Sequence, residues 1–260
     1  MVDYLTVTEL SDDEVSQEQV ERLCNRYYWA GRYCEKKDVL EAACGTGQGL
    51  GYLAKIAKTI SAGDYSDKIL AIAKKHYGDR IELRQFDAQQ LPYPDNSMDV
   101  IILFEAIYYL PSAEKFVSEC RRVLRNQGKV LIATANKDLY DFNPSPYSYR
   151  YYGVMELNDL FAKYGFQADF FGNTPIDKVS WRQRILRPVK KLAVALRIIP
   201  KTVDGKKFLK RIVFGRLVKM PREIEAGMAP YQEPVKLAPD MPDKKHKVIY
   251  CAATLQKHEG

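Results

Sequence analysis

The chain has 260 residues, of which 46% are hydrophobic and 28% are charged, and its formal net charge is +7. This length can bury a substantial core and fits one domain with an elaboration, or one domain plus a small subdomain. The composition excludes global disorder, and the five cysteines, which form no C-x-x-C pair, argue against a disulfide framework or a zinc knuckle and favour a reducing, cytoplasmic setting.

The positive charge is concentrated in one segment. Residues 178–222 contain 15 Lys and Arg and one acidic residue, a balance of +14, whereas residues 1–177 have a balance of −6. Such a segment can be a solvated lid, a clamp for an anionic acceptor, or a surface that docks on anionic lipid. A peripheral contact of residues 178–222 with the inner face of the membrane therefore stays open, although no stretch approaches the ~18 apolar residues of a spanning helix.

In chain order, a helical pattern over residues 14–34 is followed by short apolar runs that alternate with further helical patterns. The expected strands are 38–44, 59–63, 81–86, 98–104, 129–135, 166–171 and 247–255, and the expected helices between them are 50–58, 66–77, 113–124 and 156–164. This alternation predicts an α/β fold with a parallel sheet and right-handed crossovers. Residues 172–246 exceed an ordinary connection, so we expect them to form a basic, largely helical insertion, a cap or small subdomain within one domain spanning 1–260.

Three motifs follow the ends of the first three strands of this pattern. Glu41 lies in the first strand and is followed by a glycine-rich turn with Gly45 and Gly47, where the backbone can approach a ligand closely. The third position after Gly47 is leucine, which weakens a dinucleotide-binding interpretation. Asp64 ends the second strand, where a carboxylate can accept the hydroxyls of a ribose, and Asp87 ends the third, where it can accept from an exocyclic amine; each could instead be a local cap.

As an ordered set, VLEAACGTG (39–47), AGDYS (62–66), DAQQLP (87–92) and RVLRNQGKVL (122–131) resemble the class I, Rossmann-like methyltransferases that use S-adenosylmethionine (SAM). The similarity covers about residues 22–171 and is greatest to the branch that contains the ubiquinone-biosynthesis and small-molecule enzymes, with a fainter similarity to methyltransferases of bacterial polysaccharide gene clusters. It implies a seven-stranded, mostly parallel sheet with an antiparallel last strand, with SAM as cofactor and S-adenosylhomocysteine (SAH) as product. It also implies the cofactor residues Glu41, Gly45, Gly47, Asp64, Tyr65, Asp87 and Ala88, with Phe104 beside them. The family more often has Asp at position 41, which changes the reach of the side chain and not its role.

The methyl acceptor is expected beyond the fourth strand, because ligands of open α/β sheets lie at the carboxyl ends of the strands. Glu105, Tyr108 and Tyr109 are the candidate catalytic residues there. A hydroxyl acceptor would need a general base, whereas an amine need only lose its proton, and Glu105 is the candidate base, although it could only cap a loop or touch the SAM amino group. An aromatic run is a second candidate wall, or else a packed loop: Tyr140, Phe142, Tyr147, Tyr149, Tyr151 and Tyr152. Arg26 or Tyr28 could touch the SAM carboxylate or could only pack a helix.

The leading prediction is transfer of a methyl group to an oxygen or nitrogen of a small-molecule acceptor, a sugar or another anionic metabolite. A nucleic-acid methyltransferase is the first alternative, but Phe104 and Glu105 stand where such enzymes often carry an Asn-Pro-Pro-Tyr-like motif, and aromatic residues are sparse in 178–222. A non-catalytic partner subunit with the same fold is the second. No residues have metal-ligand spacing, so no metal is expected, and the sequence does not indicate an oligomeric state.

Overall fold

The computed structural model describes residue 5, residues 8–176 and residues 217–257. The strands are β1 (Glu14–Ser16), β2 (Asp38–Ala42), β3 (Thr59–Asp64), β4 (Glu82–Gln85), β5 (Met98–Phe104), β6 (Leu124–Ala135), β7 (Phe166–Pro175), β8 (Leu217–Lys219), β9 (Val235–Leu237) and β10 (His246–Leu255). The helices are α1 (Gln17–Cys34), α2 (Leu50–Ala54), α3 (Asp67–Tyr77), α4 (Ala113–Val123) and α5 (Val154–Lys163), with 3₁₀ turns η2 (Gly78–Arg80) and η3 (Ile107–Tyr109). Every strand and helix expected within these residues is present, with ends shifted by a few residues.

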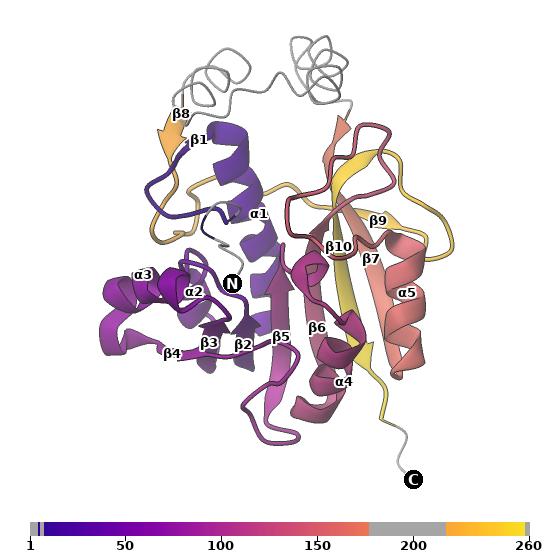
Figure 1. Cartoon of the computed structure of the whole chain (residues 1–260), viewed down its shortest axis with the longest axis horizontal. Coiled ribbons are helices and arrows are strands. Elements are labelled where there is room, and N and C mark those ends of the chain that lie inside the picture. Colours follow the sequence, from indigo (N-terminus) through magenta and orange to yellow (C-terminus); the bar gives the residue numbers. More distant parts are fainter. Residues whose placement is uncertain (1–4, 6–7, 177–216, 258–260) are drawn as a thin grey trace.

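The main sheet has the order β4-β3-β2-β5-β6-β10-β7-β9 (Figure 1). Strands β4, β3, β2, β5 and β6 run parallel, and β10 lies antiparallel between β6 and β7. The predicted α/β fold with an antiparallel last strand is confirmed. The sheet has eight strands instead of the seven expected, because β9 pairs antiparallel with the outer edge of β7. A three-residue strand carries too little periodicity to be predicted from sequence.

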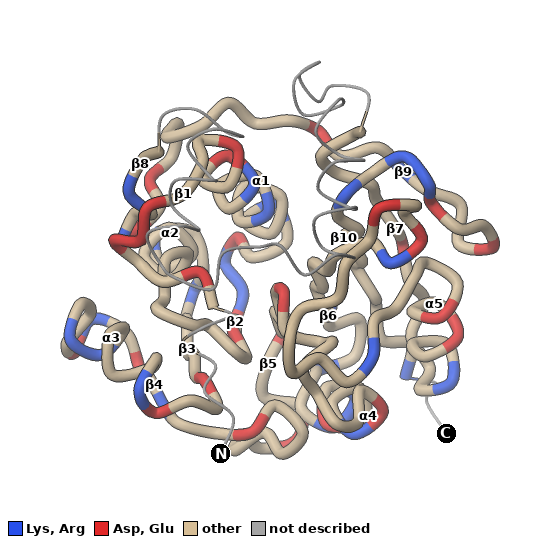
Figure 2. Tube along the Cα trace, turned by 45° about the horizontal axis from the view of Figure 1, so that its top comes forward, with Lys and Arg blue, Asp and Glu red and all other residues tan. Residues whose placement is uncertain are grey.

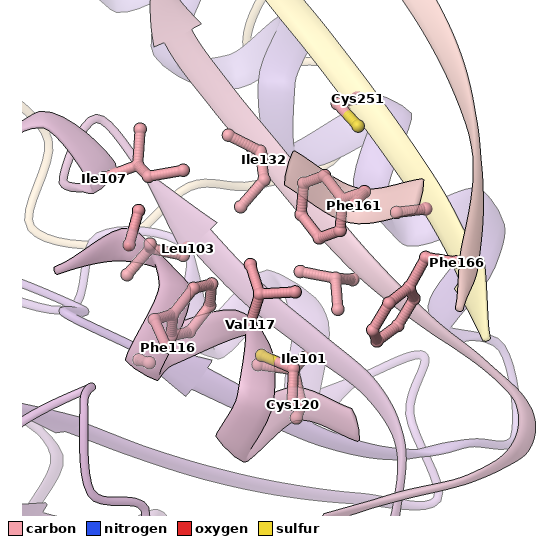
Figure 3. Packing of buried hydrophobic residues seen from close by; sticks show 14 of the residues in the cluster. Ile101, Leu103, Ile107, Phe116, Val117, Cys120, Ile132, Phe161, Phe166 and Cys251 are labelled. Carbon is pink, nitrogen blue, oxygen red and sulfur yellow. The ribbon is translucent and has the colours of Figure 1, made fainter. Parts of the chain in front are cut away.

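Both faces of the sheet are covered, which explains the uniformly apolar sequence of β5. Successive side chains of a strand point to opposite faces. On one face Ile101 and Leu103 pack in a cluster with residues of α4 and α5, among them Phe116 and Phe161 (Figure 3). On the other face Val100, Ile102 and Phe104 pack with residues of α1. The helices therefore hold the carboxyl end of β5 in a fixed position.

Helix α1 is capped at its start and packs on the main sheet near its end. It begins with a capping box in which the Ser16 side chain accepts from the Gln19 backbone and the Gln19 side chain accepts from the Ser16 backbone. Near its other end Trp29 is buried and stacks on Tyr250 of β10, with ring centroids 4.8 Å apart. This packing lays α1 against one face of the sheet (Figure 1).

The predicted insertion begins later than expected, since β7 continues to Pro175. Most of the basic segment lies outside the described residues, so its predicted helices and its role stay predictions. The described residues 217–245 contain β8 and β9 and no helix. Strand β8 pairs antiparallel with β1, so the returning chain lies beside the start of α1. None of the helices in the described part of the chain has the length and apolar character needed to cross a bilayer.

Candidate active site

A cavity of ≈ 510 Å³ opens where β2, β3 and β5 end. Ten of the eleven site residues predicted from sequence line it: Glu41, Gly45, Asp64, Tyr65, Asp87, Ala88, Phe104, Glu105, Tyr108 and Tyr109. Figure 2 shows acidic residues at the carboxyl ends of β3 and β5 and basic residues on α1. Gly47 is the exception. It packs against Tyr77, and a Cβ at this position would come 2.9 Å from the Tyr77 ring.

The turn after β2 has an unusual backbone. Ala43, Gly45 and Gly47 all have positive φ angles, of 59°, 60° and 81°. A non-glycine residue in this region costs roughly 1–2 kcal/mol, so Ala43 is strained where the strand meets the turn. The Tyr77 hydroxyl donates to the Gly47 carbonyl at 2.7 Å and fixes the turn from below. The turn therefore presents its backbone to the cavity in a preset shape.

Asp64 joins the glycine turn to the end of β3. One carboxylate oxygen accepts from the Gly45 backbone N–H at 2.9 Å and the other from the Ser66 backbone N–H at 2.8 Å. Burial raises the pKa of Asp64 above its usual value, and these backbone donors oppose the shift. Each oxygen keeps a further lone pair for a donor in the cavity.

Glu41 is the most deeply buried acidic residue of the site, with 1% of its surface exposed. One oxygen accepts from the Tyr27 hydroxyl at 2.5 Å, and the other, Oε2, is buried and has no hydrogen-bond partner among the described residues. Burial raises the pKa of Glu41 to about 7, against the lowering effects of the Tyr27 hydrogen bond and of Arg26. Gly49 makes room for this contact, since a Cβ there would lie 1.9 Å from the Tyr27 ring. A buried acceptor without a donor is the expected mark of a site for a polar or cationic ligand group.

The residues after β4 form another part of the cavity wall. Ala88 is buried, whereas the Asp87 carboxylate accepts from the Gln89 backbone at 2.8 Å and from the Gln89 side chain. Tyr65 stands at the rim and is 57% exposed. Asp87 thus has the local cap that its alternative interpretation predicts, and it also faces the cavity.

Glu105 follows β5 in a strained conformation, with a φ angle of 51°. The Tyr108 hydroxyl donates to its carboxylate at 3.0 Å, and its own backbone N–H donates to the Ala133 carbonyl at 2.7 Å. Burial raises the pKa of Glu105 above its usual value, and the positive charge of Arg26 opposes this. A strained, partly buried carboxylate facing a cavity is the arrangement expected of a functional group.

The predicted aromatic wall is only partly present. Tyr149 and Ser145 line the cavity, and the Ser145 hydroxyl lies 2.6 Å from the Tyr109 hydroxyl. Tyr151 supports the wall from behind, stacked on Tyr108 with ring centroids 4.3 Å apart. Tyr140, Phe142, Tyr147 and Tyr152 do not line the cavity. The tyrosines of this loop do not follow a helical or strand period, so the sequence could not show which of them face the cavity.

Helix α1 contributes more to the cavity than the sequence predicted. Arg26 faces the cavity and pairs with Glu9 at 3.2 Å, but Tyr28 points away and donates to the Glu225 carbonyl at 2.6 Å. Tyr27 is the residue that reaches Glu41, which the sequence analysis did not assign. Its spacing of four residues from the apolar Leu23 was a usable signal, since i and i+4 share a helix face. Tyr250 and Lys247 of β10 also line the cavity and carried no sequence signal of that role.

Within the described residues, no group of three or more His, Cys, Asp or Glu side chains is placed to hold a metal ion. Carboxylates, tyrosines and arginines are among the polar groups that line the cavity.

Comparison with known proteins finds similar methyltransferases. Residues 40–132 match a family described as a methyltransferase domain. A probable S-adenosylmethionine-dependent methyltransferase of Mycolicibacterium smegmatis is 33% identical over 161 residues, 56% of this chain and 62% of the relative. The same organism's fatty-acid O-methyltransferase is 38% identical over 104 residues (39% of this chain, 38% of the relative). A ubiquinone biosynthesis O-methyltransferase of Agrobacterium fabrum is 31% identical over 113 residues (42% and 45%).

Solved structures share the fold. A SAM-dependent methyltransferase from Aquifex aeolicus superposes with a TM-score of 0.54 at 22% identity. The superposition covers 65% of this chain and 90% of the Aquifex chain. The [4+2]-cyclase SpnF superposes with a TM-score of 0.60 at 16% identity, covering 98% of this chain and 91% of its own. The fold thus also occurs in a protein named for another reaction, so the reaction must be argued from the site.

The family match over residues 40–132, the relatives and the shared fold all support a similarity to the class I SAM-dependent methyltransferases. The predicted resemblance is confirmed, and with it SAM as the cofactor of that family. The match spans less than two thirds of the length of each relative named above, so the activity and acceptor of the whole protein are matters for proposal.

Proposed function

We propose that this protein transfers the methyl group of SAM to an oxygen or nitrogen atom of a small-molecule acceptor. The observation that carries the proposal is the buried, unpartnered Oε2 of Glu41 beside a glycine turn whose Gly45 N–H is bonded to Asp64. A carboxylate is costly to bury without a donor, and an ammonium group would supply one. SAM carries such a group, together with a sulfonium whose methyl is transferred by in-line displacement.

The cofactor end of the cavity fits the parts of SAM. Glu41 would accept from the amino group of its methionine part, and the backbone of the turn at Gly45 would border that part, with Gly47 setting the turn's shape. Asp64, held by two backbone N–H donors, would accept the ribose hydroxyls. The adenine would lie against Asp87, Ala88 and Tyr65, and Phe104, which packs edge-on against Tyr27, would close the floor.

The acceptor end is assigned to Glu105, Tyr108 and Tyr109. The Glu105 carboxylate would accept the proton that the acceptor's hydroxyl or amine loses as its lone pair forms the new bond to carbon. Tyr108 would hold that carboxylate in place through its 3.0 Å hydrogen bond, and Tyr109 would form the adjoining wall with Ser145. Methyl transfer depends chiefly on how the reacting groups are positioned. Two packed tyrosines and a strained backbone would hold them in place.

Calorimetric titration with SAM and SAH tests the cofactor site. We expect one site per chain, and we expect Asp64→Ala to weaken binding by about 1–3 kcal/mol, the scale of a lost charge-assisted hydrogen bond. Asp79→Ala, at an exposed position in η2, is the matched control and should bind as the wild type does. Normal SAH affinity in Asp64→Ala would remove Asp64 from the ribose site, and no binding to the wild type would overturn the proposal.

Methyl transfer itself is tested with labelled SAM and pools of small-molecule acceptors, with products detected by mass spectrometry. Labelled small-molecule product supports the proposal. Binding of SAM without transfer to any pool, but with labelling of added RNA or DNA, would overturn it in favour of a nucleic-acid acceptor.

A further inference from the structure

One face of helix α1 lines the cavity with polar side chains. The lining residues of this helix have the spacing i, i+3, i+4, i+7 and i+8: Gln19, Arg22, Leu23, Arg26 and Tyr27. A helix face turned toward a protein interior is normally apolar, so two arginines on it need a specific reason. Their positions four residues apart bring them together on one side of the cavity.

The cations of this wall differ in their partners. Arg26 pairs with Glu9 at 3.2 Å, and Lys247 pairs with Glu18 at 2.7 Å. Arg22 makes no hydrogen bond or ion pair with any described residue, although it faces the same cavity and is partly buried. Its guanidinium therefore keeps its donors for another group.

Arg22 belongs to the acceptor end of the cavity. Its charge acts on Glu105 and on Tyr250, in each case less strongly than that of Arg26, and it is not among the charges that act on Glu41. It lies five residues before Tyr27, which contacts Glu41, so the two Cα atoms are separated by roughly 7.5 Å along the helix axis. A ligand group at Arg22 would thus lie on the Glu105 side and apart from the methionine part of SAM.

We propose that Arg22 binds an acidic group, a carboxylate or phosphate, on the methyl acceptor. This inference rests on the proposed function and adds the substrate class to it. The planar guanidinium can form two parallel hydrogen bonds to either anion, and a partly buried site strengthens them. The acceptor is then a small acid whose anionic group is held by α1 while its hydroxyl or amine faces Glu105. Arg26, about one helical turn away, is held by Glu9 through one guanidinium nitrogen.

The test uses the full-length protein saturated with SAH, so that the carboxylate of SAH occupies its own place. Inorganic phosphate and acetate are titrated separately and followed by amide chemical shifts. We expect saturable binding of at least one anion, and the stronger of the two indicates which acidic group the acceptor carries. Arg22→Gln should weaken it by about 10-fold or more, and Arg22→Lys, which keeps the charge and loses the two-pronged geometry, by less. Arg32→Gln is the matched control, since Arg32 lies on the same helix, pairs with Glu233 and does not line the cavity.

Each other outcome is informative. Unchanged anion binding in Arg22→Gln, or no saturable binding of either anion to the SAH-bound wild type, overturns the proposal while leaving the proposed function intact. A loss of SAH affinity in Arg22→Gln also overturns it, because Arg22 would then hold the carboxylate of the cofactor. Failure of the wild type to bind SAH at all is a failure of the proposed function, and the calorimetric titration detects it separately.

Discussion

The two ends of the cavity are built in different ways. The cofactor end consists of short segments directly after β2, β3 and β4, where backbone donors, glycines and the carboxylates of Glu41 and Asp64 lie close together. The acceptor end collects single side chains from α1, from the residues after β5, from the loop around Ser145 and from the start of β10. The matched family region, 40–132, contains the first set and only part of the second.

This difference shows which functional features a sequence pattern can carry. A site made from consecutive residues at strand ends leaves a motif of fixed spacing, whereas a site assembled from distant elements does not. The family match accordingly covers the strand-end motifs and does not reach the cavity residues on α1, on the loop around Ser145 or on β10. Glu105 lies at the boundary, since it follows β5 directly and its carboxylate accepts from Tyr108 of the acceptor end.

The strongest test of this division is Glu105→Gln. If Glu105 is the general base, turnover should fall by about 10²–10⁴-fold while SAM affinity stays nearly unchanged. The amide keeps an acceptor for the Tyr108 hydroxyl, so the wall should remain intact. Initial rates with a methylated substrate from the acceptor screen, together with SAH titration, give both quantities.

The pH profile of the rate separates a base from a wall residue. A base works only when it is deprotonated, so wild-type turnover should fall as the pH drops through the pKa of Glu105, which burial raises above its usual value. That acidic limb should be absent in Glu105→Gln. Lost SAM binding would instead move Glu105 to the cofactor end, and unchanged turnover would remove it from the mechanism.

The same division explains what could be predicted from the sequence. The strands and helices along the chain followed from apolar periodicity, which is local, whereas the antiparallel last strand and most of the ten cavity residues were implied by the resemblance that the strand-end motifs carry. The sequence analysis named Tyr28 as a candidate site residue and missed Tyr27. Which of two neighbouring aromatic residues on a helix faces the site depends on the side of the helix that packs on the sheet. The roles of Tyr250 and Lys247 depend on β10 lying between β6 and β7, a long-range pairing that no local pattern contains.

Gly49→Ala tests how tightly the cofactor end is packed. Gly49 has a helical φ of −89°, so alanine alone would stabilise the fold by about 0.4–1 kcal/mol. The added Cβ would however lie 1.9 Å from the Tyr27 ring, and we expect overpacking to win, with a loss of about 3 kcal/mol in the free energy of unfolding and weaker SAH binding. Chemical denaturation measures the first quantity and calorimetry the second.

A second variant identifies the contact responsible. In a Tyr27→Ala background the clash is gone, so Gly49→Ala should become neutral or slightly stabilising. An equal loss in both backgrounds would mean that Gly49 is required by the backbone of the turn and not by Tyr27.

The smallest expected effect concerns the buried charge of Glu41. Its pKa is raised to about 7, so between its usual value and 7 the folded protein holds a proton that the unfolded chain has released. Stability must therefore fall as the pH rises through this window, by roughly 1–3 kcal/mol, and level off above it. Glu41→Gln carries no such proton, so the difference between its denaturation curves and those of the wild type at about pH 5 and about pH 8 isolates this group. Saturating SAH should remove the fall in the wild type, because an ammonium beside Oε2 favours the charged carboxylate that burial otherwise penalises. A fall that persists with SAH bound would mean that Glu41 does not meet the amino group, and the cofactor end would then depend on Asp64 and the glycine turn alone.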